Sequence, residues 1–424
     1  MKGACVRVRK IKIMSENQVI AIRNGITTAA VCGALLFAGA CGGTGSSSTK
    51  TQTPPPTGSN VASLTVNAGP AGDYANGAFT SVTVCTPGTS TCQTIDGVLV
   101  DTGSSGLRLL SSALNVSLPQ QNYTDGNPVA ECLPFVIGYT WGPVQTADVE
   151  MAGEKASSVP VQVINQLAYP LPSSSLCASN PGGPSDTLNT LGANGIVGVG
   201  SFAQDCGGAC ALAPSSGQNP DLYYECPKTG CTAIAESLTQ QVANPVSLFS
   251  ADNNGVIIEL PAVSGPETSL TGSLVFGIGT QSDNGLNGAT VYPVDDNGNF
   301  ITNFNNAQYS ESFLDSGSNA FFFPDSGIPV CADDNAFYCP TSTLNLSATN
   351  AGYNGTPTGT VNFSVANADN LFNDNLAANV FGQLAGPNTI TGFDWGLPFF
   401  YGRNVYTAIQ GQSTPGGTGP YWAY

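Results

Sequence analysis

The chain has 424 residues, of which only 9% are charged, and it contains no histidine, which excludes Ser-His-Asp and Cys-His catalysis and every histidine metal site. The 51 glycines and 29 prolines favour a β-rich body with many loops. After residue 40 the chain carries five basic and 27 acidic residues, so we expect this negative body to bind no nucleic acid.

The N-terminus has the pattern of an export signal. A basic start precedes an apolar run over residues 25–40, which is too short to span a bilayer comfortably. The run ends in LLFAGAC, which resembles a bacterial lipobox. Residues 1–40 are therefore predicted to be a lipoprotein signal peptide, and Cys41 is predicted to carry the lipid. A plain secretory signal, with Cys41 incidental, is the alternative.

Residues 41–60 are predicted to be a disordered tether, because this Gly/Ser/Thr/Pro tract cannot bury a core. The lipid anchor would then be the only contact with a membrane. The expected location is the bacterial cell envelope, at the outer membrane and facing either the periplasm or the cell surface.

Ten cysteines remain after the signal and Cys41, and an even number in an exported protein predicts disulfides. They are Cys85, Cys92, Cys132, Cys177, Cys206, Cys210, Cys226, Cys231, Cys331 and Cys339. Close spacing suggests that Cys85 pairs with Cys92 and Cys331 with Cys339. The four cysteines between 206 and 231 allow more than one pairing, and a zinc site with four thiolate ligands is their alternative. We expect disulfides, with no metal and no other cofactor.

The first half of the body contains a lone carboxylate at the end of a predicted hairpin. Residues 77–101 alternate valine with threonine, turn at a Pro-Gly pair and return as an apolar run into Asp101. Residues 194–202, NGIVGVGSF, predict an apolar strand bounded by glycines. Residues 231–249 predict an amphipathic helix, with Ile234, Leu238 and Val242 on its apolar face.

The second half repeats this order. In the segment SFLDSGSNAFFF, residues 312–323, Asp315 follows an apolar run. Asp101 follows an apolar run in the same way in VLVDTGSSGLRLL. Residues 393–396 then stand where Ile196-Val197-Gly198 stand in the first half. A further Asp-Ser-Gly at Asp325 is set aside, because the preceding proline cannot donate to a strand ladder and isoleucine replaces the motif's serine.

The residue types in the repeated motif suit chemistry by two carboxyl groups. Aspartates at tight turns can meet face to face, since glycine permits close approach of the backbone and small hydroxyls can bind the carboxylates. Two carboxylates that lie so close cannot both ionise readily, so they share one proton. One then deprotonates a water while the other polarises the scissile carbonyl.

With these motifs the chain resembles the pepsin-like aspartic peptidases, and an uncharacterised bacterial lipoprotein branch of them. VDTGSSGL and LDSGSNAF match the two catalytic motifs, and the connecting segments match loosely in the same order. The resemblance implies an all-β, bilobed (double β-barrel) acid-protease fold with a few short helices. The N-terminal lobe would be residues 61–245, carrying Asp101, and the C-terminal lobe residues 246–424, carrying Asp315.

The resemblance also implies the roles of single residues. Asp101 and Asp315 would be the catalytic dyad, and a flap tyrosine over the cleft would be Tyr139, with Trp141 as its rival. Arg108 stands where the family commonly has an aromatic residue. The residues expected to support the dyad are Thr102, Gly103, Ser104, Ser316, Gly317 and Ser318. Among these, Thr102 and Ser316 would clasp the two lobes together, while Ser104 and Ser318 would bind the carboxylates.

The implied function is that of a monomeric, acid-favouring endopeptidase whose partner is a peptide or protein substrate in extended conformation. The alternative is a non-catalytic binding or inhibitor lipoprotein with a pepsin-like fold. An occluded cleft, or an ion pair of Arg108 with Asp101 or Asp315, would favour that alternative.

Overall fold

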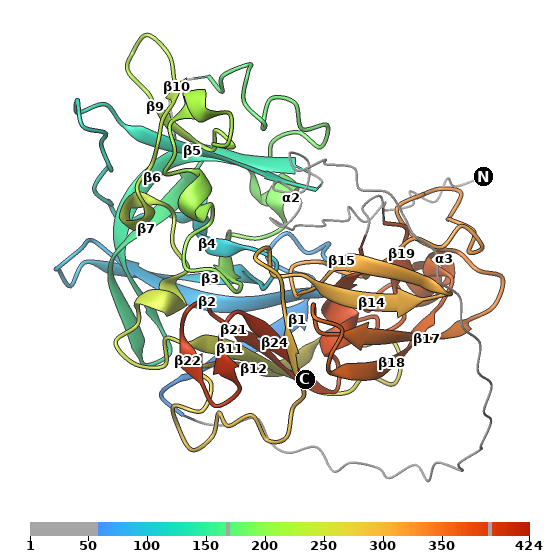
Figure 1. Ribbon diagram of the computed structural model, residues 1–424. Coiled ribbons are helices and arrows are strands. Elements are labelled where there is room, and N and C mark those ends of the chain that lie inside the picture. Colours follow the sequence, from blue (N-terminus) through green and yellow to red (C-terminus); the bar gives the residue numbers. More distant parts are fainter. Residues whose placement is uncertain (1–57, 137, 167–169, 389–391) are drawn as a thin grey trace.

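The computed structural model describes residues 58–424 except 137, 167–169 and 389–391, so the predicted signal, Cys41 and the predicted tether up to residue 57 lie outside the described residues. Strands dominate the described part, and they form sheets of fifteen, seven and two strands. Figure 1 shows β5–β7 at one end of the molecule and β14, β17 and β18 at the other, with β1–β3 between them. No helix in the described ranges is long and apolar enough to cross a membrane.

The fifteen-stranded sheet takes strands from both halves of the chain. They are β1 (Val61–Asn67), β2 (Gly77–Cys85), β3 (Cys92–Asp101), β4 (Ser105–Leu110), β5 (Val129–Phe135), β6 (Gly138–Met151), β7 (Glu154–Ile164), β8 (Gly195–Val199), β9 (Tyr223–Glu225), β10 (Thr232–Ala233), β11 (Gly255–Leu260), β12 (Leu270–Phe276), β13 (Val291–Pro293), β21 (Arg403–Ala408) and β24 (Tyr421–Ala423). Antiparallel pairing of β1 with β12 joins the two halves. The valine- and threonine-rich hairpin β2–β3 forms as predicted.

The remaining strands lie in the second half, whereas most of the helices and 3-10 turns lie in the first. The seven-stranded sheet contains β14 (Phe300–Phe304), β15 (Ala307–Asp315), β16 (Phe321–Phe322), β17 (Leu344–Ala351), β18 (Thr358–Val365), β19 (Ala385–Gly386) and β20 (Asp394–Gly396), and β22 (Ser413–Thr414) pairs with β23 (Gly417–Thr418). The helices of the described residues are α2 (Leu188–Leu191), α3 (Ala368–Asp374) and the 3-10 turns η1 (Ser111–Ala113), η2 (Gly207–Ala209), η3 (Pro214–Ser216), η4 (Leu238–Gln240), η5 (Pro245–Leu248) and η6 (Leu397–Phe400).

One local arrangement of strands occurs twice. In the first half β8 is parallel to β3 and antiparallel to β4, and Asp101 lies opposite Gly198. In the second half β20 is parallel to β15 and antiparallel to β16, and Asp315 lies opposite Gly396. The expected match between residues 196–198 and 394–396 is thus confirmed. This duplication gives an all-β fold with two similar halves, as the sequence predicts.

The predicted helix over residues 231–249 is wrong. The segment instead contains β10 and the turns η4 and η5, and Leu238 is 45% exposed. The Cys226–Cys231 disulfide closes the loop between β9 and β10, so the segment begins as a strand. At its other end Pro245 forces Asn244 into an extended conformation, which a continuous helix cannot contain.

Five disulfides account for the ten expected cysteines. The predicted pairs Cys85–Cys92 and Cys331–Cys339 are confirmed. The other three are Cys132–Cys177, Cys206–Cys210 and Cys226–Cys231. The four-thiolate zinc alternative is therefore wrong, because all four of its sulfur atoms are oxidised in two disulfides. Cys331 and Cys339 also lie close to Asp369, but their disulfide leaves no thiolate for a metal.

The core holds the two motif strands rigidly. The apolar residues that precede both aspartates are buried, among them Val100 and Leu314, which belong to one cluster that extends through both halves. Around β20 the core is aromatic: Trp395 packs edge-on against Phe321 with ring centroids 5.8 Å apart. Burying one such large side chain contributes about 1.5–3 kcal/mol, so the strand ends that carry the carboxylates are well fixed.

Candidate active site

Asp101 is the last residue of β3 and is fully buried. The backbone N–H of Gly103 donates a hydrogen bond of 2.8 Å to its Oδ1 atom, and the Ser104 hydroxyl donates one of 2.5 Å to its Oδ2 atom. The turn after the strand therefore supplies two donors that stabilise a negative charge on this carboxylate.

Asp315 is the last residue of β15 and repeats the arrangement. The N–H of Gly317 donates to its Oδ1 atom over 2.8 Å, and Ser318 Oγ lies 2.8 Å from its Oδ2 atom. Both motifs thus form the same turn, as their shared Asp-(Thr/Ser)-Gly-Ser sequence predicts.

The motif glycines bring the two carboxyl groups face to face. A Cβ atom added at Gly103 would lie 2.7 Å from Cγ of Asp315, and one added at Gly317 would lie 2.7 Å from Cγ of Asp101. Real Cβ atoms essentially never approach a neighbour so closely. Each turn therefore packs directly on the carboxyl group of the other lobe, and only glycine leaves room for it.

Thr102 and Ser316 form the expected clasp between the lobes. The Thr102 N–H donates to Ser316 Oγ over 3.1 Å, and the Ser316 N–H donates to Thr102 Oγ1 over 2.9 Å. Each hydroxyl in turn donates across the interface, from Thr102 to the Leu314 carbonyl (3.0 Å) and from Ser316 to the Val100 carbonyl (2.8 Å). All four bonds are buried, so the clasp fixes the spacing of the dyad.

Burial and mutual repulsion make the two carboxyls hard to ionise together. Burial raises the pKa of Asp101, against the hydrogen bonds from Asp315, Ser104 and Gly103, which lower it. The pKa of Asp315 is raised well above its usual range by burial and by the charges of Asp101 and Asp394. The two carboxyls therefore share one proton as a pair. In this state the pair offers one base and one acid.

A third carboxyl, to which the sequence analysis assigned no role, lies in the site. Asp394 begins β20 and is 2% exposed, and its Oδ2 atom lies 2.6 Å from Ser318 Oγ. Its signal was present in the sequence, because a lone aspartate in the apolar run GFDWGLPFF is the same anomaly that marked Asp101.

The sequence analysis also assigned no role to Tyr74. The side chain is buried, and burial, followed by the charges of Asp101 and Asp315, raises the pKa of its phenol. Asn76, two residues further on, donates a hydrogen bond of 2.8 Å to the carbonyl of Asn319, next to the second motif. Its hydroxyl has no hydrogen-bond partner among the described residues. No local pattern distinguishes this tyrosine, since only the folded chain brings the segment before β2 to the site.

Arg108 does not pair with the dyad. One guanidinium nitrogen of Arg108 lies 2.7 Å from Glu131 and 2.9 Å from Asp205, and all three side chains are fully buried. The Tyr223 hydroxyl donates to Asp205 over 2.7 Å. This buried ion cluster explains why the position is not aromatic, and it fixes β4 to β5.

The two flap candidates lie on the β5–β6 hairpin. Tyr139 is opposite Pro134 in the register, and Trp141 packs edge-on against Tyr224 with centroids 5.6 Å apart. Both contact the cluster around the Cys132–Cys177 disulfide. Their role as a flap stays a prediction. The rejected Asp325 lies in a turn at the surface, where its carboxylate accepts from Asn305 and Gly327.

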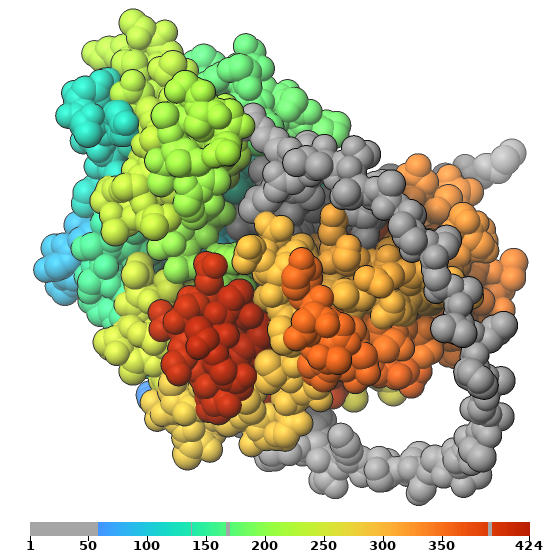
Figure 2. Space-filling model, in the orientation of Figure 1, coloured from blue at the N-terminus to red at the C-terminus, as the bar shows by residue number. Residues whose placement is uncertain are grey.

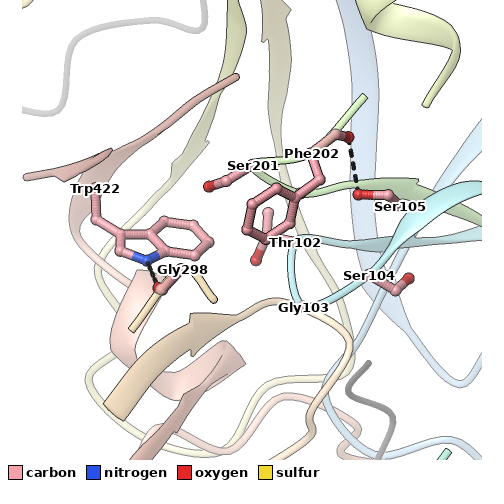
Figure 3. Close-up of a pocket in the computed structure, with 9 residues that line it drawn as sticks. Thr102, Gly103, Ser104, Ser105, Ser201, Phe202, Gly298 and Trp422 are labelled. Carbon is pink, nitrogen blue, oxygen red and sulfur yellow. Dashed lines mark hydrogen bonds between the residues drawn. The ribbon is translucent and has the colours of Figure 1, made fainter. Parts of the chain in front are cut away.

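A shallow hollow lies against the first motif (Figure 3). Its lining residues are Thr102, Gly103, Ser104, Ser105, Gly200, Ser201, Phe202, Gly298 and Trp422. The Ser105 hydroxyl donates to the Phe202 carbonyl over 2.9 Å, and Trp422 Nε1 donates to the Gly298 carbonyl over 3.0 Å. The side chain of Ser104 points away from Phe202 and Trp422, as its bond to Asp101 requires.

Figure 2 shows β22 and β23, in red, on the outer surface of the C-terminal part.

The chain matches one family model and is similar to solved structures. A family model described as "Protein of unknown function (DUF3443)" matches residues 56–424. No curated protein sequence matches the chain. Among solved structures, an aspartic proteinase from Irpex lacteus is similar with a TM-score of 0.48 and 15% sequence identity, over 86% of this chain and 96% of that chain.

Proposed function

The chain belongs to the family described as protein of unknown function DUF3443, and we propose that it is an aspartic endopeptidase that hydrolyses extended peptides with Asp101 and Asp315. The observation that carries the proposal is the reciprocal packing of Gly103 on Asp315 and of Gly317 on Asp101. Two buried carboxyls held face to face by matching turns are costly unless they share a proton. That shared proton is what acid-base hydrolysis by a carboxyl pair needs.

The proposed reaction uses one carboxylate as base and one carboxylic acid. Asp101 takes a proton from a water that attacks the peptide carbonyl, while Asp315 gives its proton to the carbonyl oxygen. When the tetrahedral diol collapses, the carbon–nitrogen bond breaks and the amine takes the proton from Asp101. The diol returns a proton to Asp315, which restores the starting state with water consumed.

One observation favours the alternative, a non-catalytic binding protein. Asp101 and Asp315 are both 0% exposed, as they would be under an occluded cleft. The other feature expected of a binding protein, an ion pair between Arg108 and the dyad, is replaced by the pairs of Arg108 with Glu131 and Asp205.

Digestion of a peptide library by the purified protein, from about pH 3 to about pH 7, decides between the two. The proposal predicts cleavage that weakens toward neutral pH and is blocked by a statine-type transition-state analogue. Peptide binding without cleavage at any of these pH values would establish the alternative instead.

We also propose that Cys41 anchors the protein to a bacterial membrane through lipid, with residues 41–60 as the tether. Support comes from the lipobox-like LLFAGAC and the Gly/Ser/Thr/Pro tract after it. The Cys41→Ser variant should leave the membrane fraction and remain folded. An unchanged distribution between membrane and soluble fractions would contradict the anchor.

A further inference from the structure

Asp394 breaks the symmetry between the two lobes. Gly198 lies opposite Asp101 in the first lobe, and Gly396 lies opposite Asp315 in the second. Two positions before these glycines, the first lobe has Ile196 and the second has Asp394. An apolar side chain thus suffices for this packing position. Burying a carboxyl at the equivalent position costs free energy, because Asp394 is only 2% exposed. We therefore expect this carboxyl to have a chemical role.

The Ser318 hydroxyl lies between two carboxyl groups. Its Oγ atom is 2.8 Å from Oδ2 of Asp315 and 2.6 Å from Oδ2 of Asp394. A hydroxyl has one proton and can donate only one of these bonds, so the other forms only if that carboxyl is protonated and donates to Ser318. In the arrangement that satisfies every bond, Asp394 donates to Ser318, Ser318 donates to Asp315, and Asp315 shares its own proton with Asp101.

Little else near Asp394 would stabilise its charge. Its Oδ1 atom is buried without a hydrogen-bond partner among the described residues. The titratable groups on the elements packed around it are Asp315, Glu311 and Tyr309 of β15, Asp101 of β3, and Tyr74 of the segment before β2. All of these are acids. The arginines of the described residues are bound elsewhere, Arg108 by Glu131 and Asp205 and Arg403 by the Phe399 carbonyl.

The order in which the carboxyls lose their protons follows from distance. Asp315 faces Asp101 directly, whereas Asp394 is separated from Asp315 by the Ser318 hydroxyl. Repulsion falls with distance, so ionising Asp394 costs less than ionising Asp315. Once Asp394 is charged, it adds to the repulsion that Asp315 must overcome.

We propose that Asp394 is a positioning residue of this site, a third carboxyl that holds a proton, acts on Asp315 through Ser318, and ionises first, so that the dyad keeps its shared proton toward neutral pH. The kinetic consequence rests on the proposed peptidase function. The number of protons that the three carboxyls hold does not rest on that function, because it is a property of the folded protein.

The proton count is measured by unfolding the protein with denaturant in weakly buffered solution near about pH 5.5, where unfolded aspartates are ionised. Asp394→Asn should release about one proton fewer per molecule than wild type. Asp325→Asn is the matched control, since it removes a surface carboxylate from the same lobe and should release as many protons as wild type. Equal release by wild type and Asp394→Asn would overturn the proposal.

If Asp394→Asn does not fold, the number of protons that the wild-type protein releases on unfolding tests the proposal. It is then measured in a background in which Glu154, Glu225, Glu236 and Glu259 are each changed to Gln, because burial raises the pKa of Glu236 to about 7 and also raises that of the other three. The proposal requires about two protons from the three-carboxyl site, and release of one or none would overturn it.

The kinetic arm compares pH profiles of peptide cleavage. Asp394→Asn should lose activity at a pH lower than wild type does, by on the order of one pH unit, while the acid side of the profile stays in place. A uniform loss at every pH would mark a merely structural role and contradict the proposal. Absence of any wild-type cleavage would refute the peptidase function, and the proton release would still decide the role of Asp394.

Discussion

At the scale of single residues, Gly317 and Gly103 are tightly constrained, because each faces the carboxyl group of the other lobe. A methyl group at Gly317 would meet Asp101 Cγ at 2.7 Å and Asp315 Oδ1 at 3.1 Å. The Gly317→Ala change should therefore displace the dyad, remove peptide cleavage and lower the free energy of unfolding by about 1–3 kcal/mol.

The control for this prediction is Gly208→Ala, where a Cβ atom would have no neighbour within 4 Å. That variant should keep both activity and stability, as measured by peptide cleavage and chemical denaturation. Full activity of Gly317→Ala would show that the two carboxyls do not have to lie as close as this structure has them.

The sequence predicted Asp101, Asp315 and the turn residues beside them as site residues, but not Asp394 or Tyr74. Asp101 and Asp315 were found because each is a lone carboxylate between an apolar run and a glycine turn, a local and repeated pattern. Asp394 has the same local signature but lacks the glycine turn, and only the pairing of β20 with β15 brings it to Ser318. The position of Tyr74 depends wholly on tertiary contacts, which no local pattern reports.

At the scale of elements, the clasp joins the end of β3 to the end of β15. Thr102 and Ser316 each donate and accept across the interface, so removing one hydroxyl leaves a buried N–H of the other residue without its acceptor. Thr102→Val or Ser316→Ala alone should each lower the free energy of unfolding by about 1–3 kcal/mol.

Each of the four bonds belongs to one hydroxyl only and ends on a backbone group of the other strand. The double variant Thr102→Val with Ser316→Ala should therefore cost about the sum of the single changes in denaturant titrations. Wild-type stability of both single variants would show that the clasp does not join the lobes.

Strands were better predicted than the one helix. Alternating valine and threonine specified the β2–β3 hairpin because sheet pairing follows the period of the side chains. Residues 231–249 have a helical period too, but the Cys226–Cys231 disulfide and Pro245 override it. The register of β20 against β15, on which Asp394 depends, is a long-range property that the periodicity of either strand does not contain.

At the scale of the whole molecule, buried carboxyls should make stability fall as the pH rises. Burial raises the pKa of Asp101, Asp315 and Asp394 in the folded state. As the pH rises above the ordinary aspartate pKa, the unfolded chain therefore releases protons that the folded chain retains. The stability present below the unfolded pKa is then lost progressively up to the folded values.

Chemical denaturation at about pH 4, about pH 5.5 and about pH 7 checks this prediction, and the free energy of unfolding should decrease along the series. Asp148 contributes with the opposite sign, because the hydrogen bonds that it accepts from Ser158, Gly88 and Lys155 lower its pKa, but it is a single group. In the Asp315→Asn variant, the free energy of unfolding should decrease less steeply with pH than in wild type. Stability that increases steadily toward neutral pH would contradict the buried, proton-sharing site.

The central claim, that Asp101 and Asp315 act together on one water, is tested most directly by the rates of peptide cleavage of wild type, Asp101→Asn and Asp315→Asn at one acid pH. An amide can neither take the proton of the water nor share the proton of the pair. Each single variant should therefore be inactive while remaining folded, and no less stable than wild type at neutral pH, since each removes one of two repelling groups. Cleavage by both variants at the wild-type rate would contradict the account.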